Sequence, residues 1–162
     1  MSVRDYPDVP RIYVDMDGVV ADFERAMKEN ELTAKELKVI PNAYRTLQPI
    51  PGAIEGINEL LDMGIFVMML TKIPSENPFS ATEKILWLYE HLPRMEDHII
   101  ISPDKGCVGT KRDTLVDDHP EWANAHNFEG RIIKFGGDDT KNTYGYASGW
   151  SALIEVIKRM PE

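Results

Sequence analysis

An alternation of short apolar runs with longer segments of helical pattern is the feature that most constrains how this chain can fold. Parallel strands need crossover connections of a dozen or more residues, and their sheets are usually covered on both faces. The alternation therefore predicts an α/β protein with a three-layer, Rossmann-like fold and a central parallel sheet of about five strands. The predicted strands cover residues 11–15, 65–70, 98–101, 114–117 and 131–135.

Three further segments are predicted to be helices. Segment 51–64 begins with a proline and ends at a glycine, as helices commonly do. Segment 80–93 contains Ser80 and, three residues later, Glu83, a capping-box pattern that makes Ser80 the expected N-cap. A last helix is expected from about Ser148. The inner face of segment 80–93 is expected to carry Ile85, Leu86, Leu88 and Tyr89.

Residues 22–48 interrupt the alternation, because they contain one or two helical patches and no strand pattern. So short a segment cannot bury a core of its own. We therefore expect one compact domain, in which residues 1–21 and 49–162 form a catalytic core and residues 22–48, called the insertion below, form a small helical cap. Open α/β sheets bind ligands at the carboxyl ends of their strands, so the cap is expected to lie over that edge.

Charge and composition exclude several classes of function. The 162 residues are 43% hydrophobic, which is enough for one globular core. A formal net charge of -9 and a pI of about 4.9 argue against a nucleic acid polymer as partner. Cys107 is the only cysteine, so no internal disulfide can form. The longest apolar run is too short to cross a membrane and the N-terminus lacks a signal-peptide pattern, so we expect a cytoplasmic protein without a membrane partner.

Polar residues follow four of the predicted strands, at the point where each strand ends. They are Asp15, Asp17, Thr71, Lys72, Lys105, Asp117 and Asp118. The carboxyl ends of parallel strands meet at one edge of a sheet, so these side chains should gather there. Like charges that lie close together repel, and carboxylate oxygens are ligands that Mg²⁺ prefers. The sequence therefore predicts a magnesium site that also holds a phosphate oxygen.

The same residues suggest a chemistry. Asp15, held against a metal-bound phosphate, could attack phosphorus and form an aspartyl-phosphate. Asp17, displaced by the turn at Gly18, could protonate the leaving oxygen and later take a proton from water. Thr71 would donate a hydrogen bond to the phosphoryl group, and Lys105 would neutralise its charge.

Four segments in this order resemble the motifs of the haloacid dehalogenase superfamily of phosphohydrolases. They read DMDGVVADF (15–23), MLTK (69–72), SPDK (102–105) and DTLVDD (113–118). The chain also resembles the 5′(3′)-deoxyribonucleotidase branch of that superfamily in PIPGA (49–53) and EKILWLYEHLP (83–93). The resemblance covers most of residues 11–118 and fades after them.

This resemblance implies a role for each matching residue. Asp15 matches the nucleophile, Asp17 the acid/base whose main-chain carbonyl also contacts the metal, and Thr71 the phosphate-binding hydroxyl. Phe23 falls where the branch places an aromatic side chain in its substrate pocket. The metal ligands implied are Asp15, Asp17, Asp117 and Asp118, and the substrate-binding residues are Phe23, Thr71, Lys72 and Lys105.

The chain also departs from the branch. The stretch between Lys105 and the second aspartate pair is longer, so Lys111 is a second candidate for the motif lysine, although we prefer Lys105. Lys72 stands where the branch usually has a serine. The insertion is shorter than is usual in the branch, so the resemblance does not define the pocket for base and sugar.

Three functions are therefore considered. The leading hypothesis is a Mg²⁺-dependent phosphomonoesterase acting on a nucleoside monophosphate, and the second is the same chemistry on another small phosphate ester such as a sugar phosphate. The third is a non-catalytic phospho-receiver, in which the lysine would come last, whereas here Asp117 and Asp118 follow it. A homodimer is the assembly considered.

Other residues have simpler interpretations. Tyr44 is expected to pack within the insertion. His119 is expected near the start of a helix beginning at about Pro120, and residues 135–145 are expected to be a surface connection.

Overall fold

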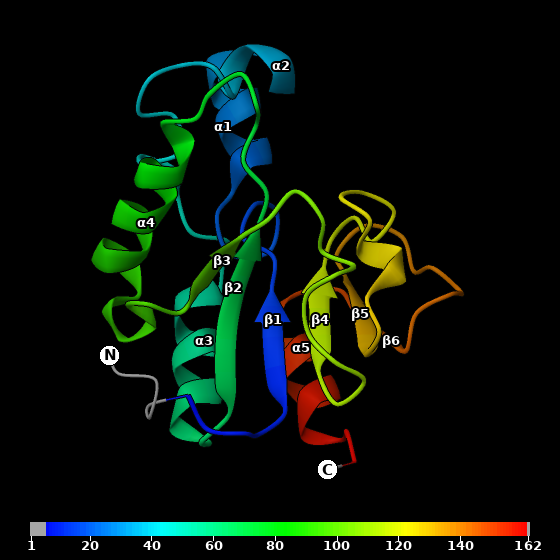
Figure 1. Ribbon diagram of the computed structural model, residues 1–162. Helices are drawn as coiled ribbons and strands as arrows, with labels where there is room; N and C mark the ends of the chain where they lie inside the picture. Colours follow the sequence, from blue (N-terminus) through cyan, green and yellow to red (C-terminus); the bar gives the residue numbers. More distant parts are fainter. Residues whose placement is uncertain (1–5, 162) are drawn as a thin grey trace.

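The computed structural model describes residues 6–161 (Figure 1). The strands are β1 (Arg11–Val14), β2 (Phe66–Thr71), β3 (Ile99–Ile101), β4 (Thr114–Asp117), β5 (Arg131–Phe135) and β6 (Gly145–Ala147). The α-helices are α1 (Phe23–Asn30), α2 (Ala34–Leu37), α3 (Ala53–Asp62), α4 (Ser80–His91) and α5 (Trp150–Lys158), and the short 3₁₀ helices include η2 (Pro93–Met95) and η3 (Ala125–Asn127).

The sheet has six parallel strands in the order β3-β2-β1-β4-β5-β6. The five predicted strands are therefore confirmed, and the α/β, Rossmann-like fold with them. Residues 136–144 form the expected surface connection, and the chain then pairs again at the sheet edge as β6, a sixth strand that was not predicted. In this order β2 and β3 are added on one side of β1, and β4, β5 and β6 on the other. The strand order therefore reverses between β1 and β4, and open α/β sheets bind ligands in the crevice at such a point.

Strand side chains alternate between two apolar clusters, one on each face of the sheet. In β2, Val67 and Met69 face the larger cluster, whereas Met68 and Leu70 face the smaller one. Figure 1 shows α3 and α5 against one face. Their apolar residues, Ile57, Leu60, Leu153, Ile154 and Ile157, belong to the larger cluster. The smaller cluster is closed by η3 and the loop after β3.

Two expectations for α4 were wrong. Ser80 is the first helical residue and Phe79 is the N-cap, without a side-chain cap, because the Ser80 hydroxyl donates to the carbonyl of Asn77 at 2.7 Å. Leu86 and Tyr89 are exposed. The buried face instead carries Ser80, Glu83, Lys84, Trp87 and Leu88.

The insertion contains α1 and α2, which lie above the carboxyl ends of the strands in Figure 1. It leaves and re-enters the core at one place, where Ala21 and Pro49 form an antiparallel bridge. Its second half is bonded to α4. Glu83 accepts the backbone N–H of Tyr44 at 3.0 Å, and the Trp87 indole donates to the carbonyl of Leu47 at 2.8 Å.

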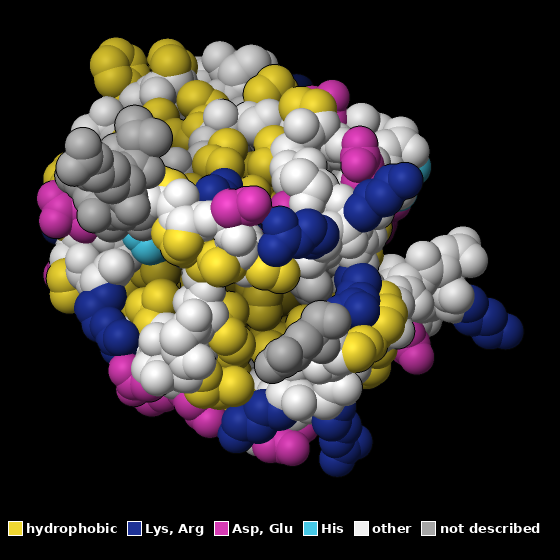
Figure 2. All heavy atoms as spheres, turned by 60° about the horizontal axis from the view of Figure 1, so that its bottom comes forward, with side chains coloured by type: hydrophobic (Ala, Val, Ile, Leu, Met, Phe, Trp, Pro, Cys, Tyr) yellow, Lys and Arg dark blue, Asp and Glu magenta, His cyan; other side chains and the backbone are white. Residues whose placement is uncertain are grey.

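The opposite end of the sheet has a different character. Figure 2 looks toward that end, where hydrophobic side chains and charged side chains of both signs are interspersed over the face. Within residues 6–161, no helix combines the length and apolarity needed to cross a membrane.

Candidate active site

A cavity of about 870 Å³ opens at the carboxyl ends of β1, β2 and β4. Its lining includes every residue predicted for the site: Asp15, Asp17, Phe23, Thr71, Lys72, Lys105, Asp117 and Asp118. Parallel pairing explains this convergence, because Val14 is in register with Met69 of β2 and with Val116 of β4. The residues that follow these strands therefore emerge at the same edge.

Lys105 joins the ends of two strands. Its ammonium group donates to Asp15 Oδ1 and to Asp117 Oδ2, each at 2.8 Å, and all three side chains are buried. Backbone N–H groups fix the carboxylates as well, since Met16 donates to Asp15 Oδ1 and His119 donates to Asp117 Oδ1, both at 2.8 Å. His119 therefore lies in a turn, and no helix begins at Pro120 as we had expected.

The electrostatics of this cluster are those of crowded acids offset by one cation. Burial raises the pKa of Asp15 well above its usual value, and the neighbouring charge of Asp117 raises it further, against the effect of Lys105. Burial likewise raises the pKa of Asp118. Burial alone would lower the pKa of Lys105, but Asp15 and Asp117 outweigh it and raise that pKa, so Lys105 remains charged.

Three carboxylates in the cavity fit a divalent cation. Asp15, Asp117 and Asp118 each offer an oxygen, and these oxygens lie within 4.8 Å of one another. These donors are hard oxygens, and together they carry more negative charge than Lys105 offsets. Mg²⁺ accepts such a donor set. The Asp17 carboxylate, also predicted at the metal, is not in this group of side chains. Its predicted contact was through the main-chain carbonyl.

Gly18 allows the close approach of Asp118. Its φ of +84° is a left-handed conformation, and a Cβ built there would lie only 2.0 Å from Asp118 Oδ2. The glycine after the first aspartate pair is therefore required by the second pair, which is far away in the sequence.

Gly18→Ala should destabilise the protein more than Gly64→Ala does. Gly64 has nearly the same conformation, φ +80°, but nothing would lie within 4 Å of a Cβ at that position. Gly64→Ala thus measures backbone strain alone, about 1 kcal/mol. We expect Gly18→Ala to lower the free energy of unfolding by about 2–4 kcal/mol in urea denaturation, because the collision with Asp118 is added.

The same two variants test Asp118 as a metal ligand. Mg²⁺ should raise the unfolding temperature of the wild type and of Gly64→Ala, because binding to the folded state stabilises it. The rise should be smaller for Gly18→Ala, whose Asp118 carboxylate has to move. Equal rises in both variants would contradict the placement of Asp118 at the metal.

Lys84 is a site residue that the sequence analysis missed. Its side chain is 0% exposed, and its ammonium group donates to Asp17 Oδ2 at 2.9 Å and to Thr71 Oγ1 at 2.7 Å. It also donates to the carbonyl of Lys72 at 2.9 Å and lies over the ring of Tyr44. The other oxygen of the Asp17 carboxylate, Oδ1, is buried and has no hydrogen-bond partner within residues 6–161. The buried Lys84 thus fixes the side chains of Asp17 and Thr71, two predicted site residues that lie beside the Asp15 cluster.

The helical spacing contained a signal for Lys84. Residues 80, 84, 87 and 88 lie on one face of a helix, and Trp87 is the largest apolar residue in the segment. Centring the buried face on Trp87 brings Lys84 inward and turns Leu86 and Tyr89 outward, as observed.

The remaining predicted residues differ in where they lie relative to the cavity. Phe23 stacks on Tyr44 with ring centroids 5.5 Å apart, so Tyr44 both packs within the insertion and lines the cavity. Lys72 lines the cavity with an exposed side chain. Lys111, the second candidate for the motif lysine, lines a different cavity, beside Asp113.

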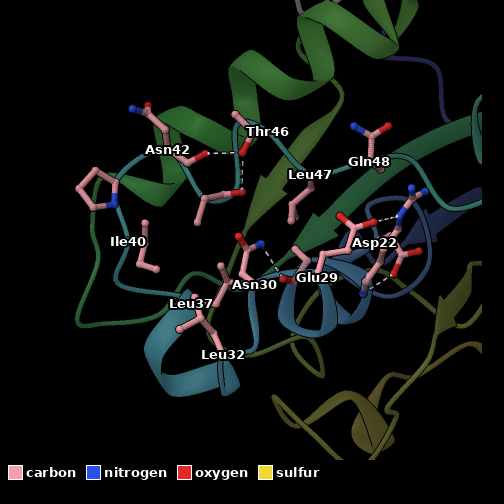
Figure 3. Close-up of a pocket in the computed structure, with 14 residues that line it drawn as sticks. Asp22, Glu29, Asn30, Leu32, Leu37, Ile40, Asn42, Thr46, Leu47 and Gln48 are labelled. Atoms are coloured by element: carbon pink, nitrogen blue, oxygen red, sulfur yellow. Dashed lines mark hydrogen bonds and ion pairs between the residues drawn. The ribbon is translucent and has the colours of Figure 1, made fainter.

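A further cavity of about 370 Å³ lies between α1, α2 and residues 40–48 (Figure 3). Several of its polar side chains bond to one another or to the backbone. Asp22 accepts the backbone N–H of Arg25, the Arg25 guanidinium donates to Glu29, and Asn30 donates to the carbonyl of Ala26. With these groups engaged, this cavity offers less to a ligand than the cavity at the strand ends.

Comparison with known proteins gives the relatives of this chain. The model of a family described as 5′ nucleotidase, deoxy (Pyrimidine), cytosolic type C protein matches residues 36–160. The resemblance therefore does not fade after residue 118, as we had expected. A Bordetella bronchiseptica protein provisionally named a 5′(3′)-deoxyribonucleotidase is 32% identical in an alignment 139 positions long, which covers 67% of this chain and 74% of that protein. The human 5′(3′)-deoxyribonucleotidase, cytosolic type, is 27% identical in an alignment 142 positions long, which covers 67% of this chain and 70% of that protein.

Solved structures share the fold at lower identity. A phosphoserine phosphatase superposes with a TM-score of 0.63 at 15% identity, covering 95% of this chain and 100% of that one. A D,D-heptose 1,7-bisphosphate phosphatase from B. bronchiseptica, complexed with magnesium and phosphate, has a TM-score of 0.59 at 15% identity, with 93% and 99% covered.

Proposed function

Because the chain belongs to the cytosolic type C deoxy-5′-nucleotidase family, within the haloacid dehalogenase superfamily, we propose that it is a Mg²⁺-dependent phosphatase that removes phosphate from nucleoside monophosphates. The observation that carries the proposal is the convergence of Asp15, Asp117 and Asp118, with oxygens within 4.8 Å of one another, at the cavity that Lys105 and Thr71 also line.

The metal enters this proposal through three side chains. Asp15, Asp117 and Asp118 would hold Mg²⁺, which when bound offsets the negative charge of the phosphate and of the carboxylates. Lys105 serves the same purpose from within the chain, because its ammonium group is buried between two of these acids.

Asp15 is the proposed nucleophile. Its Oδ1 accepts hydrogen bonds from Lys105 and from the N–H of Met16, so we assign attack on phosphorus to Oδ2. The new Oδ2–P bond forms as the bond between phosphorus and the ester oxygen breaks, and the product is an aspartyl-phosphate. Thr71 and Lys105 hold the phosphoryl group during the transfer.

Asp17 is the proposed acid and base. In the first step it gives its proton to the leaving ester oxygen, which departs as the nucleoside hydroxyl. In the second step it takes a proton from water, which attacks phosphorus and releases inorganic phosphate and free Asp15. Lys84 binds Asp17 Oδ2 and leaves Oδ1 for this proton, because Oδ1 has no partner among residues 6–161.

Phosphate release from a panel of esters tests the proposal. Deoxyribonucleoside and ribonucleoside monophosphates are compared with sugar phosphates, each with Mg²⁺ and with a chelator, and the Asp15→Asn variant serves as the blank. We expect release from nucleoside monophosphates that the chelator abolishes and excess Mg²⁺ restores. Release from sugar phosphates alone would overturn the nucleotide assignment and leave the phosphatase chemistry in place.

A further inference from the structure

Among the aromatic residues that line the cavity outside the insertion, Phe135 of β5 is buried and Trp122 is exposed. Trp122, in the loop after β4, is 62% exposed and lines the same cavity as Asp15 and Asp118. The other two tryptophans, Trp87 and Trp150, are 0% and 3% exposed. Single exposed aromatic residues are common on protein surfaces, so exposure alone assigns no role to Trp122.

The loop that carries Trp122 is held in an unfavourable backbone conformation. Ala123 and Asn124 follow it with φ values of +52° and +56°, and alanine rarely adopts this left-handed region. Such strain persists only where the surroundings impose it, and it is concentrated at functional sites. The backbone next to Trp122 is thus held in one conformation at an energetic cost.

Hydrogen bonds to the loop carrying Lys105 impose this conformation. The N–H of Lys105 donates to the carbonyl of Ala123 at 2.8 Å, and the Asn124 amide donates to Asp104 Oδ1 at 2.8 Å. The position of Trp122 is therefore linked directly to that of the phosphate-neutralising lysine.

His119 supports the indole from one side. The two rings stack with centroids 3.7 Å apart and an interplanar angle of 17°, and His119 is itself bonded to Glu121 at 2.9 Å. A stacked pair that still leaves 62% of Trp122 exposed offers a rigid, flat surface to a planar ligand group.

We infer that Trp122, backed by His119, is the surface on which the base of the substrate stacks. The inference rests on the proposed function, and it assigns base recognition to a wall of the cavity formed by the loop after β4, separate from the Phe23–Tyr44 pair of the insertion. Stacking suits any base, because every base has an aromatic face. The pair would therefore favour nucleotides over sugar phosphates without selecting one base.

Kinetics with and without a base test this role. The wild type, Trp122→Ala and Trp122→Phe are compared on a nucleoside monophosphate and on ribose 5-phosphate, which carries no base, in the presence of Mg²⁺. For Trp122→Ala we expect the ratio of kcat/KM between the nucleotide and ribose 5-phosphate to fall about tenfold, mainly through KM for the nucleotide. Trp122→Phe, which keeps an aromatic ring, should retain most of the wild-type ratio. Phe79→Ala is the matched control, because Phe79 is 76% exposed and does not line the cavity.

Fluorescence provides a readout independent of turnover. Trp122 is the exposed tryptophan, so a base stacked on it should quench the emission of the Asp15→Asn variant when a nucleoside monophosphate is added with Mg²⁺. Ribose 5-phosphate should not quench it, and adding Trp122→Phe should abolish the nucleotide effect.

The outcomes separate this inference from the proposed function. An unchanged substrate ratio in Trp122→Ala, an equal loss on both substrates, or quenching that survives Trp122→Phe would overturn the stacking role. Absence of phosphate release by the wild type from every ester would overturn the proposed function, and the fluorescence titration would then decide the stacking role alone.

Discussion

Asp15→Asn should release phosphate from nucleoside monophosphates about 10⁴-fold more slowly than the wild type, or slower still. An amide oxygen is a poor nucleophile toward phosphorus, and removal of a covalent nucleophile typically costs several orders of magnitude in kcat. The change is nearly isosteric, so Lys105 and the N–H of Met16 keep an oxygen to bond to. Steady-state phosphate release with saturating Mg²⁺ measures the effect.

Two controls make this result specific. The unfolding temperature of Asp15→Asn without Mg²⁺ should equal or exceed that of the wild type, because burial and the charge of Asp117 oppose ionisation of Asp15. Asp62→Asn, at a surface ion pair with Arg94, should retain full activity. A folded Asp15→Asn variant with more than about one hundredth of wild-type activity would contradict the assignment of the nucleophile.

Lys84→Met should affect both stability and activity. The substitution keeps an unbranched apolar stem but removes the ammonium group, so Asp17 Oδ2, Thr71 Oγ1 and the carbonyl of Lys72 lose their donor. Removing one partner of a buried ion pair costs about 3–5 kcal/mol. Because the Asp17 side chain is 30% exposed, we expect a loss of about 3 kcal/mol in the free energy of unfolding. We also expect kcat to fall about 100-fold, as Asp17 and Thr71 lose their orientation.

Urea denaturation and steady-state kinetics measure these effects. Lys28→Met is the matched control, because Lys28 is 75% exposed and pairs with Glu24 on the surface of α1, so its loss should change stability by no more than about 0.5 kcal/mol. Adding Asp17→Asn to Lys84→Met removes the uncompensated charge and should recover part of the stability but none of the activity. Equal stability of Lys84→Met and Lys28→Met would show that the buried ammonium group contributes nothing.

The sheet and the carboxylate cluster were predictable because both follow from local patterns. Strand-length apolar runs mark β1 to β5, and an aspartate pair directly after a parallel strand must emerge at the edge where its neighbours end. The three residues of β6 follow a polar loop and carry little pattern of their own, so tertiary pairing with β5 determines that strand.

The environment of Asp17 was less accessible from the sequence. Lys84 comes from a helix whose inner face was predicted from apolar residues alone, and Glu83 from an expected capping box. Glu83 instead bonds to the backbone of Tyr44, in a segment remote in sequence. Helical spacing can place Lys84 on the buried face, but the partners of Lys84 and Glu83 depend on how α4 packs against distant segments, and no local periodicity contains that information.

The antiparallel bridge between Ala21 and Pro49 has an evolutionary consequence. Because it fastens the two ends of the insertion to each other, residues can be gained or lost between them without shifting the register of β1 against its neighbours. Selection can thus remodel the covering of the active site, and with it the range of compounds admitted, while the apparatus for phosphoryl transfer is inherited unaltered.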